Sequence, residues 1–123
     1  MRIIAIDHVQ LAMPAGREDD ARRFYSDLLG LPERPKPPQL AKRSGAWFES
    51  DSVKIHVGVE ADFRPARKAH PALLVRGLAE LVDRLRAAGF DVVEDAPTGA
   101  PQTYVSDPFG NRLELIDAES ETP

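Results

Sequence analysis

The hydrophobic pattern of the chain alternates between the period of two typical of a half-buried strand and the wider spacing of an amphipathic helix. The clearest strand is Val53–Val59, where branched apolar residues alternate with Lys54, His56 and Gly58. The same alternation predicts further strands at residues 2–13, 46–50, 70–75, 90–94, 102–106 and 112–117.

Two amphipathic helices are predicted between these strands. The first covers residues 17–29, and its apolar stripe consists of Ala21, Phe24, Tyr25, Leu28 and Leu29. The second follows Gly77, with a stripe of Leu78, Leu81, Val82, Leu85 and Ala88. Gly30 and Gly89 stand where helices commonly end. The proline-rich segment 32–44 is expected to form an edge strand or an extended surface loop, because proline has no donor for a strand ladder.

The order of these elements repeats within the chain. A strand, a helix ending in glycine and three strands occur once in each half, which is the signature of an internal duplication. We therefore predict an α+β domain made of two modules, at about 1–60 and 69–118, joined by a linker at 61–68 and followed by an acidic tail at 118–123. A length of 123 residues fits one domain of this kind.

Four polar residues occupy corresponding positions in the two halves. His8 and His56 lie in the opening and closing strands of the first half, and His70 and Glu114 hold the same places in the second half. All four lie on the strand face away from the most apolar residues. A single histidine on such a face more often points into solvent than binds a metal or substrate. Four equivalent positions in a duplicated unit favour a shared metal site, with ligands at about 2.0–2.2 Å if the strands curve into a cup.

Composition narrows the possible functions. A net charge of −4 argues against nucleic acid or an anionic membrane as the main partner. The chain has no cysteine, so any metal must be held by nitrogen and oxygen. No apolar run approaches the roughly 20 residues of a membrane span. These features predict a cytoplasmic protein.

Weaker candidates for substrate contacts share these strands; they are Gln10, Phe48, Tyr104 and Arg112. Gln10 suits either a pocket wall or the filling of a barrel. Arg112 suits either an anionic substrate or an ion pair with Glu114. The two aromatic rings suit pocket walls, although rings in short strands more often belong to the core. The turn Asp107–Asn111 is predicted to be structural, since its proline and glycine fit turn positions.

Several local motifs resemble those of a known superfamily. They are Asp7-His8-Val9, Phe24-Tyr25 with Leu28-Leu29-Gly30-Leu31, Ile55-His56-Val57, His70 at the start of a strand, Ala88-Gly89-Phe90, and Asp107–Asn111 leading into Leu113-Glu114-Leu115. With these motifs the chain resembles the vicinal oxygen chelate superfamily, which includes glyoxalase I, fosfomycin-resistance thiol transferases, extradiol dioxygenases and bleomycin-binding proteins. The resemblance spans nearly the whole chain. It implies two βαβββ modules that form a cupped, barrel-like mixed sheet around a divalent metal.

The resemblance also implies roles for individual residues. His8, His70 and Glu114 match the metal triad of the family, and His56 falls where glyoxalase I has a second glutamate. A histidine there suits either a fourth metal ligand or an acid–base group near neutral pH. Glu114 and His56 are therefore the candidate catalytic residues. One divalent ion per site is expected, with Fe, Mn, Ni, Zn and Co as the candidates.

The main functional prediction is a metalloenzyme that acts on a small substrate with neighbouring oxygens, as a lyase or isomerase, a thiol transferase or a dioxygenase. The alternatives are a metal-free protein that sequesters a drug-like molecule, as bleomycin-binding relatives do, and a small regulatory domain. The intact triad favours the enzyme. Because relatives often build the site across a dimer, a homodimer is also implied, and the ligands can come from one chain or two.

Overall fold

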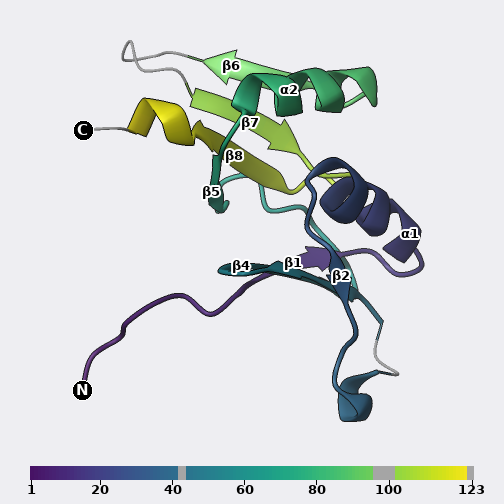
Figure 1. The fold of residues 1–123 in the computed structure, drawn as a ribbon. Helices are drawn as coiled ribbons and strands as arrows, with labels where there is room; N and C mark the ends of the chain where they lie inside the picture. Colours follow the sequence, from purple (N-terminus) through teal and green to yellow (C-terminus); the bar gives the residue numbers. More distant parts are fainter. Residues whose placement is uncertain (42–43, 96–101, 122–123) are drawn as a thin grey trace. The chain divides into compact units, whose positions relative to one another are not determined.

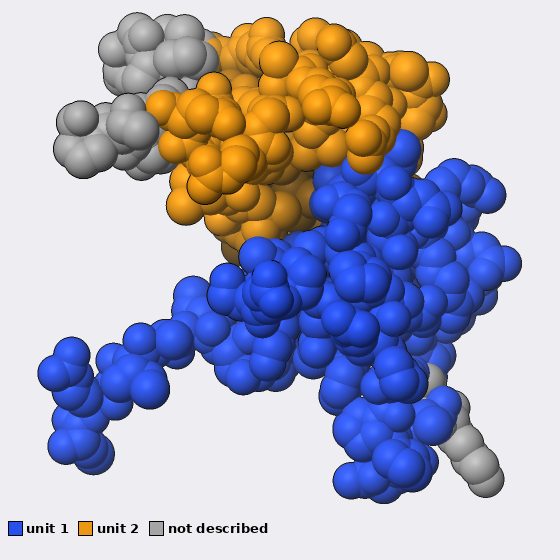
Figure 2. All heavy atoms as spheres, viewed as in Figure 1, with its two compact units in different colours: residues 1–64 blue, residues 65–123 orange. Residues whose placement is uncertain are grey.

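The computed structural model describes residues 1–41, 44–95 and 102–121. The chain divides into two compact units, residues 1–64 and 65–123, which Figure 2 shows in different colours. The boundary between them falls inside the predicted linker. Each unit contains a four-stranded mixed sheet, so the α+β fold class is confirmed. In the described part of the chain, every helix is too short or too polar to span a bilayer.

The first unit follows the predicted order of elements. Strand β1 (Val9–Met13) leads to the short helix α1 (Glu18–Ala21), which continues as the wider π-helical segment η1 (Arg22–Leu28). They are followed by β2 (Glu33–Arg34), the 3-10 turn η2 (Pro38–Leu40), β3 (Ala46–Ser50) and β4 (Val53–Val59). The sheet order is β1-β4-β3-β2, with β1 parallel to β4 and the other pairs antiparallel. Strand β2 confirms an edge strand in the proline-rich segment, whose positions 42–43 lie outside the described residues.

The second unit repeats this topology (Figure 1). Its elements are β5 (Ala72–Val75), α2 (Leu78–Ala87), β6 (Val92–Asp95), β7 (Gln102–Ser106) and β8 (Arg112–Asp117). The sheet order is β5-β8-β7-β6, and again the opening strand is parallel to the closing one. The predicted acidic tail begins with a 3-10 turn, η3 (Ala118–Glu121), and positions 122–123 lie outside the described residues.

Each sheet buries one face against its own helix. In the first unit Phe24 and Tyr25 are fully buried, and the Tyr25 ring stacks on Phe48 with centroids 5.5 Å apart. In the second unit the buried residues of α2 are Val82 and Leu85, and α2 packs against β6 and β8. Burial of such side chains is the main stabilising contribution in modules of this size. The opposite face of each sheet carries the polar residues.

The opening strand is shorter than the predicted 2–13, because β1 starts only at Val9. The parallel register pairs Val9 with Ile55, and β4 begins at Val53, immediately after the Asp51–Ser52 turn. The first residues of the chain therefore extend beyond the end of their partner strand.

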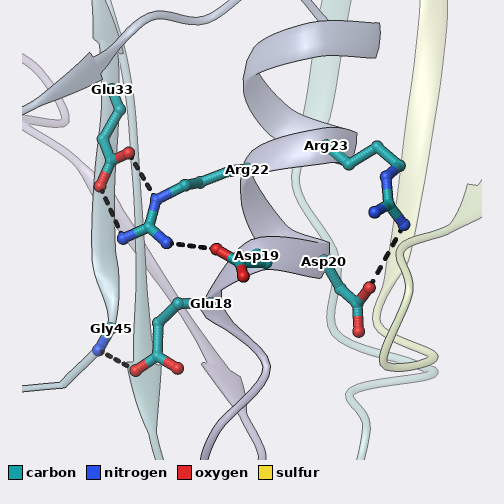
Figure 3. Close-up of polar contacts among 7 residues, drawn as sticks. All are labelled: Glu18, Asp19, Asp20, Arg22, Arg23, Glu33 and Gly45. Atoms are coloured by element: carbon teal, nitrogen blue, oxygen red, sulfur yellow. Dashed lines mark hydrogen bonds and ion pairs between the residues drawn. The ribbon is translucent and has the colours of Figure 1, made fainter.

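A set of charged contacts ties the first helix to the edge of its sheet (Figure 3). The Arg22 guanidinium donates to both carboxylate oxygens of Glu33, at 2.7 and 3.3 Å, and to Asp19 at 2.8 Å. These bonds, with Glu33 first, raise the pKa of Arg22 above its ordinary value. The backbone N–H of Gly45 donates to the Glu18 carboxylate. The short strand β2 and the start of β3 are thus fixed to the helix by side chains.

The turn between β7 and β8 fixes the start of the second unit. Asp107 and Asn111 are 4% and 1% exposed. The Asp107 carboxylate accepts hydrogen bonds from the backbone N–H groups of Phe109 and Asn111 and from the Asn111 side chain. The Asn111 side-chain oxygen accepts from Ala66 N–H, and the Ala66 carbonyl accepts from Arg112 N–H. The later part of the predicted linker is therefore bound to this turn.

Candidate functional site

In the first unit the polar face of the sheet is built around His56. The register places Gln10 of β1 and Trp47 of β3 on either side of His56 in β4. The His56 ring stacks on Trp47, with centroids 4.1 Å apart and planes inclined by 4°, and on His8, at 4.2 Å and 19°. Two aromatic faces therefore enclose the imidazole, and polar groups reach it only at its edge.

The edge of His56 that carries Nε2 faces a carboxylate. His56 Nε2 lies 2.6 Å from Glu49 Oε2, and the histidine is only 6% exposed. Since a carboxylate can only accept, Nε2 is the donor in this bond. His56 is thus held in one orientation by two rings and one hydrogen bond.

His8 precedes β1 and is more exposed. Its Nδ1 donates to Asp7 Oδ2 at 2.9 Å. This hydrogen bond, followed by the charge of Lys54 at 3.7 Å, lowers the pKa of Asp7. With Nδ1 occupied as a donor, Nε2 is the nitrogen of the neutral His8 ring that can accept or bind a cation.

In the second unit His70 and Glu114 meet directly. His70 lies just before β5, and its Nδ1 donates to the Lys68 carbonyl at 2.8 Å. Its Nε2 lies 3.1 Å from Glu114 Oε1 on β8. With Nδ1 donating, Nε2 can also donate to Glu114 only in the imidazolium form. In the neutral form, two lone pairs would face each other, which is an arrangement that a cation would stabilise.

Tyr104 and Arg112 extend this polar face. Tyr104 is opposite Glu114 in the register, and its ring meets the His70 ring edge-on with centroids 5.8 Å apart. The Arg112 guanidinium lies 3.8 Å above the Tyr104 ring. Arg112 therefore makes a cation–π contact with Tyr104. Among the described residues, the ion-pair partner of Glu114 is His70 and not Arg112. Both Tyr104 and Arg112 line a hollow of about 700 Å³ in this unit.

The structure groups most of the predicted site residues within their own units. His8, His56 and Gln10 share one face, and so do His70, Glu114, Tyr104 and Arg112. Phe48 is different, because it pairs with Ile55 on the buried face, is fully enclosed and stacks on Tyr25. Its predicted role as a pocket wall is therefore corrected to a role in the core.

Sequence reasoning missed Trp47 and Glu49, which contact His56 in place of Phe48. The sequence of the hairpin would have been enough to place Trp47 beside His56. A two-residue turn at Asp51–Ser52 fixes the pairing of Ser50 with Val53, and that pairing places Trp47 opposite His56.

His8 and His70 are oriented in a way that suits binding of a divalent cation. His8 and His70 each hold Nδ1 in a hydrogen bond to an oxygen, which is the outer contact that commonly orients a metal-ligating imidazole and leaves Nε2 for the metal. Within the described residues, no group of three or more His, Asp or Glu side chains is already gathered as a metal site.

The sequence of the chain matches a known family of proteins. Residues 10–116 match the profile of the glyoxalase-like domain. The chain belongs to this family and, with it, to the vicinal oxygen chelate superfamily.

Solved structures agree with this assignment. The chain is 46% identical to a glyoxalase family protein from Bacillus anthracis, with 94% of this chain and 95% of that one covered and a TM-score of 0.86. It shares the fold of the fosfomycin resistance protein FosX from Listeria monocytogenes, at 15% identity, 94% and 92% coverage and a TM-score of 0.71. FosX from Mesorhizobium loti gives 13% identity, 93% and 92% coverage and a TM-score of 0.70. A search among curated proteins returned no significant match.

Proposed function

We propose that the protein is a divalent-metal-dependent enzyme that acts on a small substrate through two neighbouring oxygens. The observation that carries this proposal is the hydrogen-bonding state of the two histidines. The Nδ1 atoms of His8 and His70 are both committed to oxygen acceptors, and the Nε2 of His70 faces the Glu114 carboxylate at 3.1 Å. His8, His70 and Glu114 would hold the metal, whether they come from one chain or from two copies.

The residues around that metal would have different roles in the reaction. When bound, the metal would act as a Lewis acid that stabilises negative charge on substrate oxygens. His8 and His70 are each oriented by a hydrogen bond from Nδ1, whereas His56 is oriented through Nε2, which is bonded to Glu49. We therefore assign His56 as the group that takes or returns a proton, with Glu49 and Trp47 as positioning residues. A His56 metal bond through Nε2 would require the Glu49 contact to break.

The reaction belongs to the classes expected from the sequence, namely a lyase or isomerase, a thiol transferase or a dioxygenase. FosX relatives show that this fold serves fosfomycin resistance, so fosfomycin is one rational substrate to test, together with glutathione adducts and catechols. A cytoplasmic location also stays a prediction.

Metal binding can be followed through Trp47, which is the single tryptophan of the chain. Its ring stacks on His56, which in turn stacks on His8, a proposed ligand. Adding Zn²⁺ or Mn²⁺ to chelator-treated protein should change the Trp47 emission and saturate at one ion per site. Calorimetry should give the same half-saturation point, and His56→Ala should remove most of the emission change while leaving binding measurable.

The same titration separates the two functional candidates. If neither metal binds and neither changes the emission, the proposal fails and a metal-free binding protein becomes the better explanation. If a metal binds, the candidate substrates can be tested on protein of known metal content.

Arg112 is proposed to bind an anionic group of the substrate. Its guanidinium is held over Tyr104 and borders the hollow of the second unit. Arg112→Ala is expected to weaken binding of an anionic substrate or competitor by about tenfold or more, since a charge-assisted hydrogen bond is worth about 1.5–3 kcal/mol. Metal affinity should stay unchanged. Equal losses for anionic and neutral ligands would contradict the assignment.

A further inference from the structure

The hollow of the second unit has two sides of opposite charge. Arg67 and Arg112 border it on the side of β8, and Asp91 and Asp95 border it on the side of β6. Arg67 is placed there by its neighbour Ala66, whose carbonyl accepts from Arg112 N–H. A volume of about 700 Å³ suits a small organic ligand. Such a ligand would meet cationic groups on one side and anionic groups on the other.

The strand order keeps the two sides apart. In the sheet order β5-β8-β7-β6, strand β7 lies between them and contributes Tyr104 and Ser106 to the hollow (Figure 1). Ser106 is aligned with Arg112, and the ladder of β6 and β7, continued by one residue, places Asp91 opposite Ser106. Neighbouring strands are about 4.8 Å apart, so two strand spacings separate the backbones of Arg112 and Asp91 by about 10 Å. This spacing leaves room for a ligand between a guanidinium and a carboxylate.

The opposite charges around the hollow do not pair with each other. Among the residues that the structure describes, no ion pair joins the two aspartates to the two arginines. The Arg112 guanidinium instead lies 3.8 Å from the centre of the Tyr104 ring, which brings its charge from β8 towards β7. The distance that remains to the carboxylates of β6 is short. It suits a head group whose two charges lie a few bonds apart.

Apolar groups line the space between the charges. Val93 of β6 is 57% exposed and lines the hollow together with Phe90 and Pro108. Val93 is aligned with Tyr104, which in turn is aligned with Glu114, a proposed metal ligand. The apolar part of a ligand can therefore lie on Val93 and Tyr104, and the row that these residues form leads towards the proposed metal ligand.

We propose that this hollow recognises a small zwitterion, namely a compound with an α-amino acid head group and an apolar side chain. The two arginines bind its carboxylate, the two aspartates bind its ammonium group, and its side chain packs on Val93 and Tyr104. The inference rests on the proposed function in one respect, because it extends the anionic group already assigned to Arg112. It adds a cationic group and thereby names a class of substrate.

Three ligands of matched shape test this assignment. L-phenylalanine carries both charges, N-acetyl-L-phenylalanine carries only the carboxylate, and L-phenylalaninamide carries only the ammonium group. Each is titrated into chelator-treated protein and followed by NMR chemical shifts, so that no metal takes part. L-phenylalanine should bind at least about tenfold more tightly than either analogue, because each analogue loses one charge-assisted contact. Equal affinities for L-phenylalanine and its N-acetyl analogue, or no binding of any of the three, would overturn the proposal.

A double variant tests the acidic side of the hollow by itself. Asp91→Asn combined with Asp95→Asn should lower the affinity for L-phenylalanine to that for its N-acetyl analogue, because the ammonium group loses its partners. The affinity for the N-acetyl analogue should not fall. Glu94→Gln is the matched control, since Glu94 is a carboxylate of the same strand that does not line the hollow. A double variant that prefers L-phenylalanine as strongly as the wild type does would contradict the assignment.

These titrations fail or succeed independently of the metal. A protein that prefers the zwitterion but binds no divalent metal would refute the proposed function and leave the zwitterion site supported. A protein that binds metal but does not distinguish the three ligands would refute the zwitterion site and leave the proposed function standing.

Discussion

Replacing Glu114 with alanine is expected to reduce the affinity for a divalent metal by at least about 100-fold, because losing even an outer contact of a metal ligand commonly costs about 10–100-fold. Glu114 supplies the only carboxylate of the proposed triad, and it lies 3.1 Å from His70 Nε2. Calorimetry on chelator-treated protein measures the change.

Two variants make this result specific to the site. Glu94→Ala removes a carboxylate from an exposed position of β6 and should bind metal as the wild type does. His70→Ala should lose metal in parallel with Glu114→Ala. If the Glu114→Ala affinity matches that of Glu94→Ala, Glu114 is not a ligand and the triad is wrong.

Asp107→Ala is expected to lower the free energy of unfolding by about 3 kcal/mol or more, because it leaves buried donors without their acceptor. The carboxylate accepts from two backbone N–H groups and from the Asn111 side chain, and both Asp107 and Asn111 are almost fully enclosed. Asn111 in turn holds Ala66, so the start of the second unit depends on the same bonds. Urea unfolding, followed by circular dichroism, measures the change.

The matched control is Asp91→Ala, which removes an exposed carboxylate just before β6. Such surface changes usually stay within about 0.5 kcal/mol. Asp107→Asn should fall between the two, since one side-chain oxygen can still accept from backbone N–H groups. An Asp107→Ala variant as stable as Asp91→Ala would show that the turn does not support the fold.

Periodicity was sufficient to predict the elements that carry the site. The alternation in Val53–Val59 placed His56 on the polar face, and that in Arg112–Asp117 placed Glu114 there, because a strand has only two faces. The repeated order of elements predicted two similar modules, and the two sheets do share one strand order. The family resemblance supplied the fold class, which the glyoxalase-like domain match confirms.

Features that depend on distant pairing could not be predicted from local pattern. The first strand was expected to begin at residue 2, but the pairing of Val9 with Ile55 decides where it starts. The Asp107–Asn111 turn was predicted to be structural, yet nothing local shows that Asn111 binds Ala66, which is 45 positions earlier. A helical stripe likewise does not reveal that η1 is wound more widely than an α-helix.

His56 shows how the structure refines a sequence hypothesis. The resemblance left open whether His56 is a ligand or an acid–base group. Its 2.6 Å contact with Glu49 is made through Nε2, whereas the rings of His8 and His70 are each oriented by a hydrogen bond from Nδ1. Glu49 lies two positions from Trp47 on the same strand, so one face of β3 supplies both residues that hold His56. This arrangement favours the acid–base role.

The most direct measurement for the proposed metal centre is anomalous diffraction from a crystal grown with bound Zn²⁺ or Mn²⁺, recorded on both sides of the absorption edge of that metal. The proposal predicts one strong peak per site, at a bond length of about 2.0–2.2 Å from His8 Nε2, His70 Nε2 and a Glu114 oxygen. The same map would show whether these ligands come from one copy or two. A fully loaded crystal with its peak elsewhere, or with these three side chains apart from any metal, would contradict the account.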